Sequence, residues 1–175
     1  MRHARLHHSA SILPGPKQVG SEKGTAGADV FVGTNYADRF DGGLGADSIS
    51  GGNGSDVLEG GSGKDTLSGG NGDDILRGGS GDDTFVFHKA AEAGNVNLYD
   101  RITDFESGYD KIDLSGFMAG GKFIGTAPLM AGAGPQVMYD QAHAMIYGDV
   151  NGDGMADFQF YLNNAPTVVA SDFIF

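Results

Sequence analysis

The middle of the chain repeats itself every nine residues. Residues 51–59 read GGNGSDVLE, and the next nine residues read GGSGKDTLS. Seven such units follow one another from Gly24 and together cover residues 24–86. A short fixed period is the signature of a stacked array, in which each unit buries its apolar side chain only against its neighbours. The repeat therefore restricts this segment to a coiled, solenoid-like fold.

Two positions have the same type of residue in all seven units: the sixth residue is aspartate and the eighth is apolar. The aspartates are Asp29, Asp38, Asp47, Asp56, Asp65, Asp74 and Asp83, and the apolar residues are Phe31, Phe40, Ile49, Leu58, Leu67, Leu76 and Phe85. Because side chains alternate along a strand, position eight should face a core while positions seven and nine face solvent. We expect each unit to form a six-residue turn and a three-residue strand.

Glycine suits the turn because it adopts positive φ without a steric penalty, which lets successive carbonyl groups point inward. The first two units are weaker, since Thr25 and Thr34 replace the second glycine and Tyr36 replaces the third. Outer units of an array contact a neighbour on one side only, so weaker outer repeats are expected.

Two units, or eighteen residues, make one coil with strands on opposite sides, and successive coils should stack at about 4.8 Å. The predicted fold is all-β: a right-handed parallel β-roll with two nonapeptides per turn, followed by a small antiparallel β cap. The predicted organisation is a flexible leader over 1–23, the roll over 24–87, and a cap with a secretion-signal region over 88–175.

Stacking places aspartates eighteen residues apart along each edge of the roll. Two unit charges about 4 Å apart repel by about 4 kcal/mol at an effective dielectric constant near 20. Calcium would relieve this repulsion, because it accepts six to eight oxygen ligands, backbone carbonyls included, and tolerates irregular geometry better than magnesium. The predicted calcium ligands in the roll are Asp29, Asp38, Gly43, Gly45, Asp47, Gly52, Gly54, Asp56, Gly61, Gly63, Asp65, Gly70, Gly72, Asp74, Gly79, Gly81 and Asp83.

The composition points the same way. The chain carries 23 acidic against 11 basic residues, 31 glycines and no cysteine. This charge argues against nucleic acid as a partner, and the absence of cysteine excludes disulfides and thiolate metal sites. The phased apolar residue argues against a disordered linker, and Asp65 after Lys64 breaks the pattern of a phosphate-binding loop. No stretch is long and apolar enough for a membrane span.

Residues 42–86 match GGxGxDxUx five times with every glycine and aspartate intact, and this segment resembles the RTX, or hemolysin-type, repeat of calcium-dependent β-rolls. Residues 100–117, DRITDFESGYDKIDLSGF, resemble the segment that follows the roll in serralysin-type proteases and in the R-modules of alginate epimerases. Ile102, Phe105, Ile112 and Leu114 should cover the last coil. Asp100 and Asp110 are further predicted calcium ligands, ahead of Asp104 and Asp113.

A second acidic segment lies near the C-terminus, between strands expected around 137–139, 144–150 and 157–162. Asp149, Asn151, Asp153 and Gly154 match the first half of an EF-hand loop, and Asp157 stands at its ninth position. Position twelve, however, is Phe160 instead of glutamate, and strands flank the loop. Both a calcium loop and a simple Asn/Asp/Gly turn fit this segment.

The chain ends in TVVASDFIF, which resembles the uncleaved export signal of type I secretion substrates. The same residues also fit a last edge strand, and one segment can serve both purposes before and after folding. The resemblance implies a secreted, extracellular protein that meets the type I secretion machinery in transit.

No HExxH or GxSxG motif occurs, and a cysteine nucleophile is impossible, so we expect no enzyme activity in this chain. The predicted function is a calcium-binding RTX module that folds outside the cell and carries a C-terminal secretion signal. The alternative is the C-terminal part of a secreted serralysin-like metalloprotease or alginate-modifying enzyme, with a fused catalytic domain and a role in engaging a polysaccharide. The net negative charge argues against a polyanion such as alginate.

Overall fold

The computed structural model describes residues 21–88, 99–164 and 167–175, and this part of the chain is almost entirely β. The strands of the repeat segment are β1 (Glu22–Lys23), β2 (Val30–Val32), β3 (Arg39–Leu44), β4 (Ser48–Asn53), β5 (Val57–Ser62), β6 (Thr66–Asn71), β7 (Ile75–Ser80) and β8 (Thr84–Val86). Those that follow are β9 (Arg101–Ile102), β10 (Lys111–Asp113), β11 (Lys122–Phe123), β12 (Gln136–Asp140), β13 (Met145–Asp149), β14 (Phe158–Leu162) and β15 (Phe173–Ile174), with a short 3-10 helix η2 (Ala170–Asp172) before β15.

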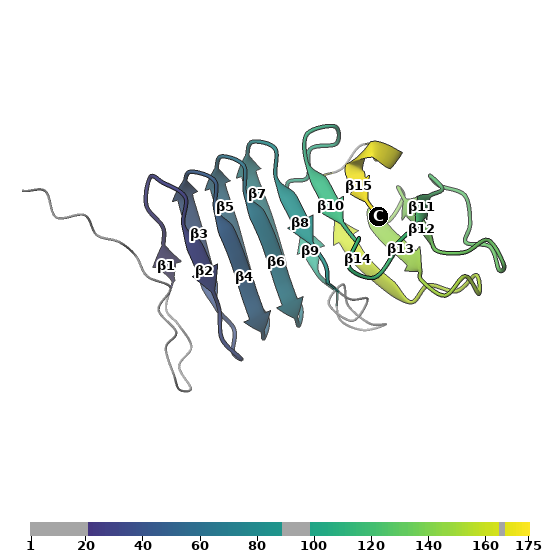
Figure 1. Ribbon diagram of the computed structural model, residues 1–175, viewed down its shortest axis with the longest axis horizontal. Helices are drawn as coiled ribbons and strands as arrows, with labels where there is room; N and C mark the ends of the chain where they lie inside the picture. The colour runs from purple at the N-terminus through teal and green to yellow at the C-terminus, as the bar shows by residue number, and fades with distance from the viewer. Residues whose placement is uncertain (1–20, 89–98, 165–166) are drawn as a thin grey trace, which may run out of the picture.

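The strands alternate between two sheets, which confirms the parallel roll with two units per coil. One sheet has the order β1-β3-β5-β7-β9-β14-β13-β12-β11, and the other has the order β15-β10-β8-β6-β4-β2. Figure 1 shows the coils side by side along the long axis of the molecule, with β1 and β2 at one end and the C-terminal strands at the other. No described helix is long and apolar enough to cross a membrane.

The eighth residue of each unit forms the core, as predicted. In one sheet, Phe40, Leu58, Leu76, Ile102 and Leu162 pair in register across five successive strands. In the other, Phe31, Ile49, Leu67, Phe85, Ile112 and Phe173 pair in the same way. The two apolar ladders face each other between the sheets, and all of these side chains except Phe31 are buried.

The strands are longer than the three residues that the repeat pattern predicts. β3 to β7 each have six residues, covering positions seven to nine of one unit and positions one to three of the next. Pairing continues past the glycines, as between Gly43 and Gly61. Because adjacent coils repeat the same backbone shape, the bend at each glycine is copied in the neighbouring coil and the ladder is not interrupted.

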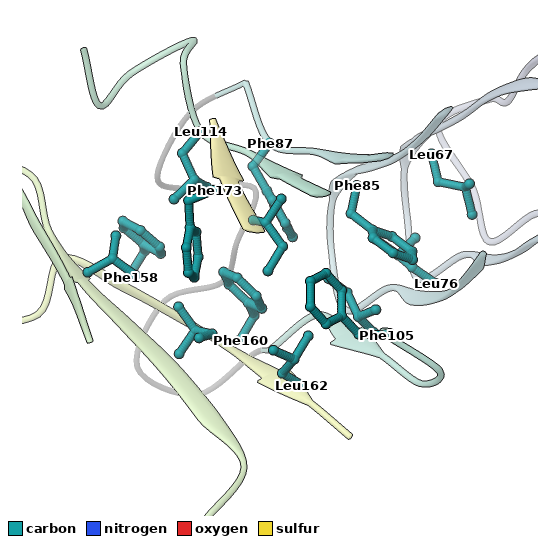
Figure 2. Packing of buried hydrophobic residues seen from close by; sticks show 14 of the residues in the cluster. Leu67, Leu76, Phe85, Phe87, Phe105, Leu114, Phe158, Phe160, Leu162 and Phe173 are labelled. Atoms are coloured by element: carbon teal, nitrogen blue, oxygen red, sulfur yellow. The ribbon is translucent and has the colours of Figure 1, made fainter. Parts of the chain in front are cut away.

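The C-terminal segment continues both sheets. β9 pairs with β7, and β10 with β8, so each sheet of the roll gains a further parallel strand. β14, β13 and β12 then form the antiparallel part of the cap at the three strand positions that the sequence predicts. Figure 2 shows Phe85, Phe87, Phe105, Phe160 and Phe173 packed together where the roll meets the cap.

Most of the predicted leader lies outside the described residues, but its last two residues do not fit a flexible segment. Glu22 and Lys23 form β1 and pair with Phe40 and Asp41 of β3. Lys23 Nζ also lies 2.9 Å from Asp41 Oδ2. The first sheet therefore begins before the first repeat unit, because the open edge of β3 offers unpaired backbone groups.

Candidate metal sites between the coils

The aspartates at position six stack into two columns, one along each edge of the roll. In every step, the backbone N–H of one aspartate donates to Oδ1 of the aspartate in the next coil, over 2.7 to 3.0 Å. One column runs through Asp29, Asp47, Asp65, Asp83 and Asp110, and the other through Asp38, Asp56, Asp74 and Asp100. The predicted columns are therefore present, and Asp100 and Asp110 extend them beyond the repeat.

The second oxygen of the interior carboxylates is buried without a hydrogen-bond partner. This holds for Oδ2 of Asp47, Asp56, Asp65 and Asp83, whose side chains are at most 2% exposed. A buried charged oxygen without a donor costs several kcal/mol. Four such atoms at equivalent positions indicate a recurring partner that is not a protein group.

The glycine at position one leaves the space in front of each of these oxygens. A Cβ atom on Gly60 would contact Oδ2 of Asp65 and lie 2.6 Å from the carbonyl oxygen of Gly78 in the next coil. A Cβ on Gly51 would likewise contact Oδ2 of Asp56 and lie 2.7 Å from the carbonyl oxygen of Gly69. A carboxylate oxygen and a carbonyl oxygen thus converge at Asp47, Asp56 and Asp65, and these are oxygen donors that calcium accepts.

The remaining predicted glycines have the backbone conformation that the turn requires. The glycines at position two, Gly43, Gly52, Gly61, Gly70 and Gly79, have φ between 96° and 108°. Those at position four, Gly45, Gly54, Gly63, Gly72 and Gly81, have φ between 122° and 143°. Side chains with a Cβ rarely adopt such angles, so the glycine pattern follows from the shape of the turn.

Burial makes these carboxyl groups hard to ionise. Desolvation raises the pKa of Asp56 to about 6, with a further contribution from the charge of Asp38. Desolvation also raises the pKa of Asp83 to about 6, and the charges of Asp110 and Asp65 add to it. The pKa values of Asp47, Asp65 and Asp110 are raised for the same main reason. A bound cation would reverse this effect, since it favours the ionised form.

No group of three or more His, Cys, Asp or Glu side chains is arranged to hold a metal ion within residues 21–88, 99–164 and 167–175. The columns explain this finding, because each coil contributes a single aspartate to an edge. Any ion between coils would take most of its oxygens from backbone carbonyls, which calcium accepts and transition metals seldom do.

The acidic residues after the roll hold its last coil in place. Asp104 accepts hydrogen bonds from the backbone N–H groups of Gly78 and Gly79, at 3.0 and 2.9 Å. Asp113, in contrast, accepts hydrogen bonds from the backbone N–H and hydroxyl of Ser115, two residues ahead in the chain. These contacts give Asp104 a structural role at the end of the roll.

Asp172 binds the loop that precedes Asp110, and sequence reasoning missed this role. Its carboxylate is fully buried and accepts hydrogen bonds from Ser107 Oγ at 2.7 Å and from the backbone N–H of Gly108 and Val169 at 2.9 Å each. The signal in the sequence is a single acid within an apolar C-terminal run.

The segment 149–157 forms a compact series of Asx turns. Asp149 is buried and accepts backbone N–H bonds at 2.6 and 2.8 Å from the residues three and five positions ahead. Asn151 and Asp153 each accept a backbone N–H from two residues ahead, and Asp157 Oδ2 closes the loop on the N–H of Val150 at 2.7 Å. Each of these carboxylates already has backbone donors, so calcium binding here stays a prediction.

Comparison with known proteins places the chain in a family. The family model described as Peptidase M10 serralysin C terminal matches residues 24–175. Two solved structures from the mannuronan C5-epimerase of Azotobacter vinelandii are similar. The AlgE6R3 subunit is 29% identical over 87% of this chain and 80% of its own, with a TM-score of 0.33. The AlgE6R2 subunit is 26% identical over 90% of this chain and 91% of its own, with a TM-score of 0.40.

A comparison with curated proteins found no match. The family match covers the whole roll and everything that follows it, and so it includes both aspartate columns. From residue 24 to its last residue, the chain therefore belongs to the serralysin C-terminal family of M10 peptidases, as an RTX-type β-roll module.

Proposed function

We propose that this chain is a calcium-dependent folding module of a secreted protein, which crosses the cell envelope unfolded through type I secretion machinery and folds when it meets extracellular calcium. The calcium ligands would be the interior position-six carboxylates together with backbone carbonyls of the adjacent turns. Asp100 would contribute at the C-terminal end of one column, whereas both oxygens of Asp110, at the end of the other column, already accept backbone N–H groups.

The observation that carries this proposal is the set of buried, unpartnered Oδ2 atoms of Asp47, Asp56, Asp65 and Asp83. They belong to four units of the repeat, and at Asp47, Asp56 and Asp65 a backbone carbonyl oxygen of the next coil lies close to the carboxylate, in front of the glycine at position one. Water or a side-chain donor would satisfy one oxygen of each pair, but a divalent cation satisfies the carboxylate and the carbonyl together.

Without calcium, several features oppose folding. The glycine-rich turns lose much conformational entropy on ordering, and the buried carboxylates repel one another. Sites of extracellular modules bind calcium in the range of about 0.1 to 1 mM, so they would be empty where free calcium is scarce and filled outside the cell. Because the sites do not exist in the unfolded chain, the binding energy becomes folding energy.

The position of the C-terminal segment supports export before folding. Residues 173 and 174 form β15, which pairs with β10 at the end of the second sheet. Phe173 is buried and stacks on Phe123, with ring centroids 4.9 Å apart. A secretion signal in this segment could be read only while the chain is unfolded, and the same residues then complete the folded module.

Circular dichroism during a calcium titration tests the proposal, with magnesium as the control ion. We expect a transition from coil to β with calcium and little change with magnesium, because magnesium demands tighter octahedral geometry and retains its waters. The variant Asp56→Ala, Asp65→Ala, Asp74→Ala should lose the transition.

A second triple variant, Glu59→Ala, Asp82→Ala, Glu106→Ala, makes the same change in net charge outside the columns and should keep the transition. A roll that is fully ordered in excess chelator at neutral pH would refute the proposed function. Loss of the transition in both triple variants would show that net charge, rather than site geometry, controls folding.

A further inference from the structure

In the first two repeat units, the aspartate at position six has hydrogen-bond partners that the interior units lack. Oδ2 of Asp29 accepts hydrogen bonds from the backbone N–H of Thr25 at 2.6 Å and from its hydroxyl at 2.9 Å. Oδ2 of Asp38 accepts the same pair from Thr34, at 2.6 and 3.0 Å. The oxygen that is unpartnered in the interior coils therefore has two donors in the first coil.

The orientation of each threonine hydroxyl is fixed by a further contact. Thr34 Oγ1 accepts the backbone N–H of Tyr36 at 3.1 Å, and Thr25 Oγ1 accepts that of Gly27 at 3.2 Å. Because these contacts use an acceptor lone pair, the hydroxyl proton is available for the aspartate. Each threonine thus acts as a true donor to the carboxylate.

The cause lies at position two of the unit. Interior units carry glycine there, and Gly52, for example, has φ of 102°. Thr25 and Thr34 are not among the described residues with positive φ, as expected for β-branched side chains. In this backbone conformation, the N–H of position two donates to the aspartate four residues ahead.

The column that begins with Asp29 ends with Asp110, and Asp110 accepts a backbone hydrogen bond of the same kind. Asp110 Oδ2 accepts the backbone N–H of Glu106, four residues earlier, at 2.8 Å. The carboxylates at both ends of the column are therefore satisfied by the protein itself, and those between them are not.

From this contrast we infer that Thr25 and Thr34 take the place of calcium in the first coil. Asp29 and Asp38 are then structural residues of an ion-free end coil over 24–41, and the ion-binding rows begin at Asp47 and Asp56. This inference rests on the proposed calcium function and narrows it. The residue at position two decides whether the aspartate of a unit binds an ion or accepts hydrogen bonds from its own unit.

An ion-free end coil has a physical advantage. Hydrogen bonds to a charged acceptor are stronger than those to a neutral one, so the two donors from each threonine stabilise the carboxylate without an ion. The calcium sites along each column then begin at a defined unit.

Counting bound calcium ions by native mass spectrometry, with calorimetric titration as a second measure, tests the inference on the full chain. Thr25→Gly, Thr34→Gly should raise the count by one or two ions relative to the wild type. Thr25→Ser, Thr34→Ser keeps both hydroxyl groups and should leave the count unchanged.

A second pair of variants covers the case in which the glycine variant fails to fold. Asp29→Asn, Asp38→Asn should leave the wild-type count unchanged, whereas Asp47→Asn, Asp56→Asn should lower it. An unchanged count in a folded glycine variant, or a lower count after the change at Asp29 and Asp38, would overturn the inference. A wild-type count of zero would refute the calcium function itself, and this inference with it.

Discussion

The two aspartates with the most clearly raised pKa values predict how the metal-free roll responds to pH. Desolvation raises the pKa of Asp56 and Asp83 to about 6, from an ordinary value of 3.8. A group with a raised pKa contributes stability that is fully present below its unfolded pKa and is lost as the pH rises through its folded pKa. The metal-free roll should therefore lose stability between about pH 4 and pH 7.

The magnitude follows from the pKa values. A difference of about two pH units corresponds to about 3 kcal/mol for one group. Solvent near the edges of the coils screens part of this, so we expect on the order of 1 to 3 kcal/mol from each aspartate. Together they should lower the free energy of unfolding by roughly 2 to 6 kcal/mol across this range, which is a large share of the stability of a small domain.

Circular dichroism in calcium-free buffer between about pH 4 and pH 7 measures this loss as a decrease in the folded fraction, with urea unfolding at each pH where the roll is folded. Asp56→Asn, Asp83→Asn should flatten the pH dependence and make the metal-free form more stable at neutral pH. In saturating calcium, the same variant should be less stable than the wild type, because it has lost two ligands. The opposite sign of the two effects distinguishes a calcium ligand from an ordinary buried carboxylate.

The exposed neighbour Asp82 provides the control, since Asp82→Asn changes charge beside the column without entering it. It should leave both the pH dependence and the calcium dependence close to those of the wild type. A metal-free roll that is more stable at neutral pH than at about pH 4.5 would refute the reasoning, because the buried carboxylates would then be stabilised by the protein without an ion.

Two further predictions concern packing. Gly60→Ala places a Cβ against the Asp65 carboxylate and 2.6 Å from a backbone carbonyl oxygen, so it should raise the calcium concentration at the folding midpoint by at least tenfold, about 1.4 kcal/mol. The control Gly27→Ala, whose Cβ meets nothing closer than 4.0 Å, should leave the midpoint unchanged. Equal midpoints for the two variants would contradict the proposed site. Phe173→Ala should lower the free energy of unfolding of the calcium-bound form by about 3 to 5 kcal/mol, and with it the melting temperature. Ile174→Ala, at a side chain that is 40% exposed, should have a small effect. The reverse order would show that the C-terminal strand does not complete the core.

Much of the fold could be predicted because the repeat carries its own geometry. A nonapeptide with one apolar residue and one aspartate fixes which side chain is buried and which lies at the edge, and stacking multiplies that choice along the roll. The six-residue strands could not be predicted in this way. Their extra pairing comes from identical glycine bends in adjacent coils, which is a property of two coils in contact and not of one unit.

The candidate site shows the same division. The aspartates and glycines of the unit were evident from the pattern, and Asp100 and Asp110 followed from a resemblance. Asp172 could not be found in this way, because it reaches Ser107 and Gly108 from 65 and 64 residues away in the chain, respectively. The hydrogen bonds to Oδ2 of Asp29 and Asp38 could not be predicted either, although Thr25 and Thr34 were evident as departures from the repeat.

The sequence by itself determined the period, the two apolar ladders and the two columns of carboxylates, because each depends only on spacing within the unit and on the alternation of side chains along a strand. Only the tertiary structure decided which carboxylate oxygens have donors and which do not. That difference depends on the direction of single backbone N–H groups across neighbouring coils, and one threonine in place of glycine is enough to change it.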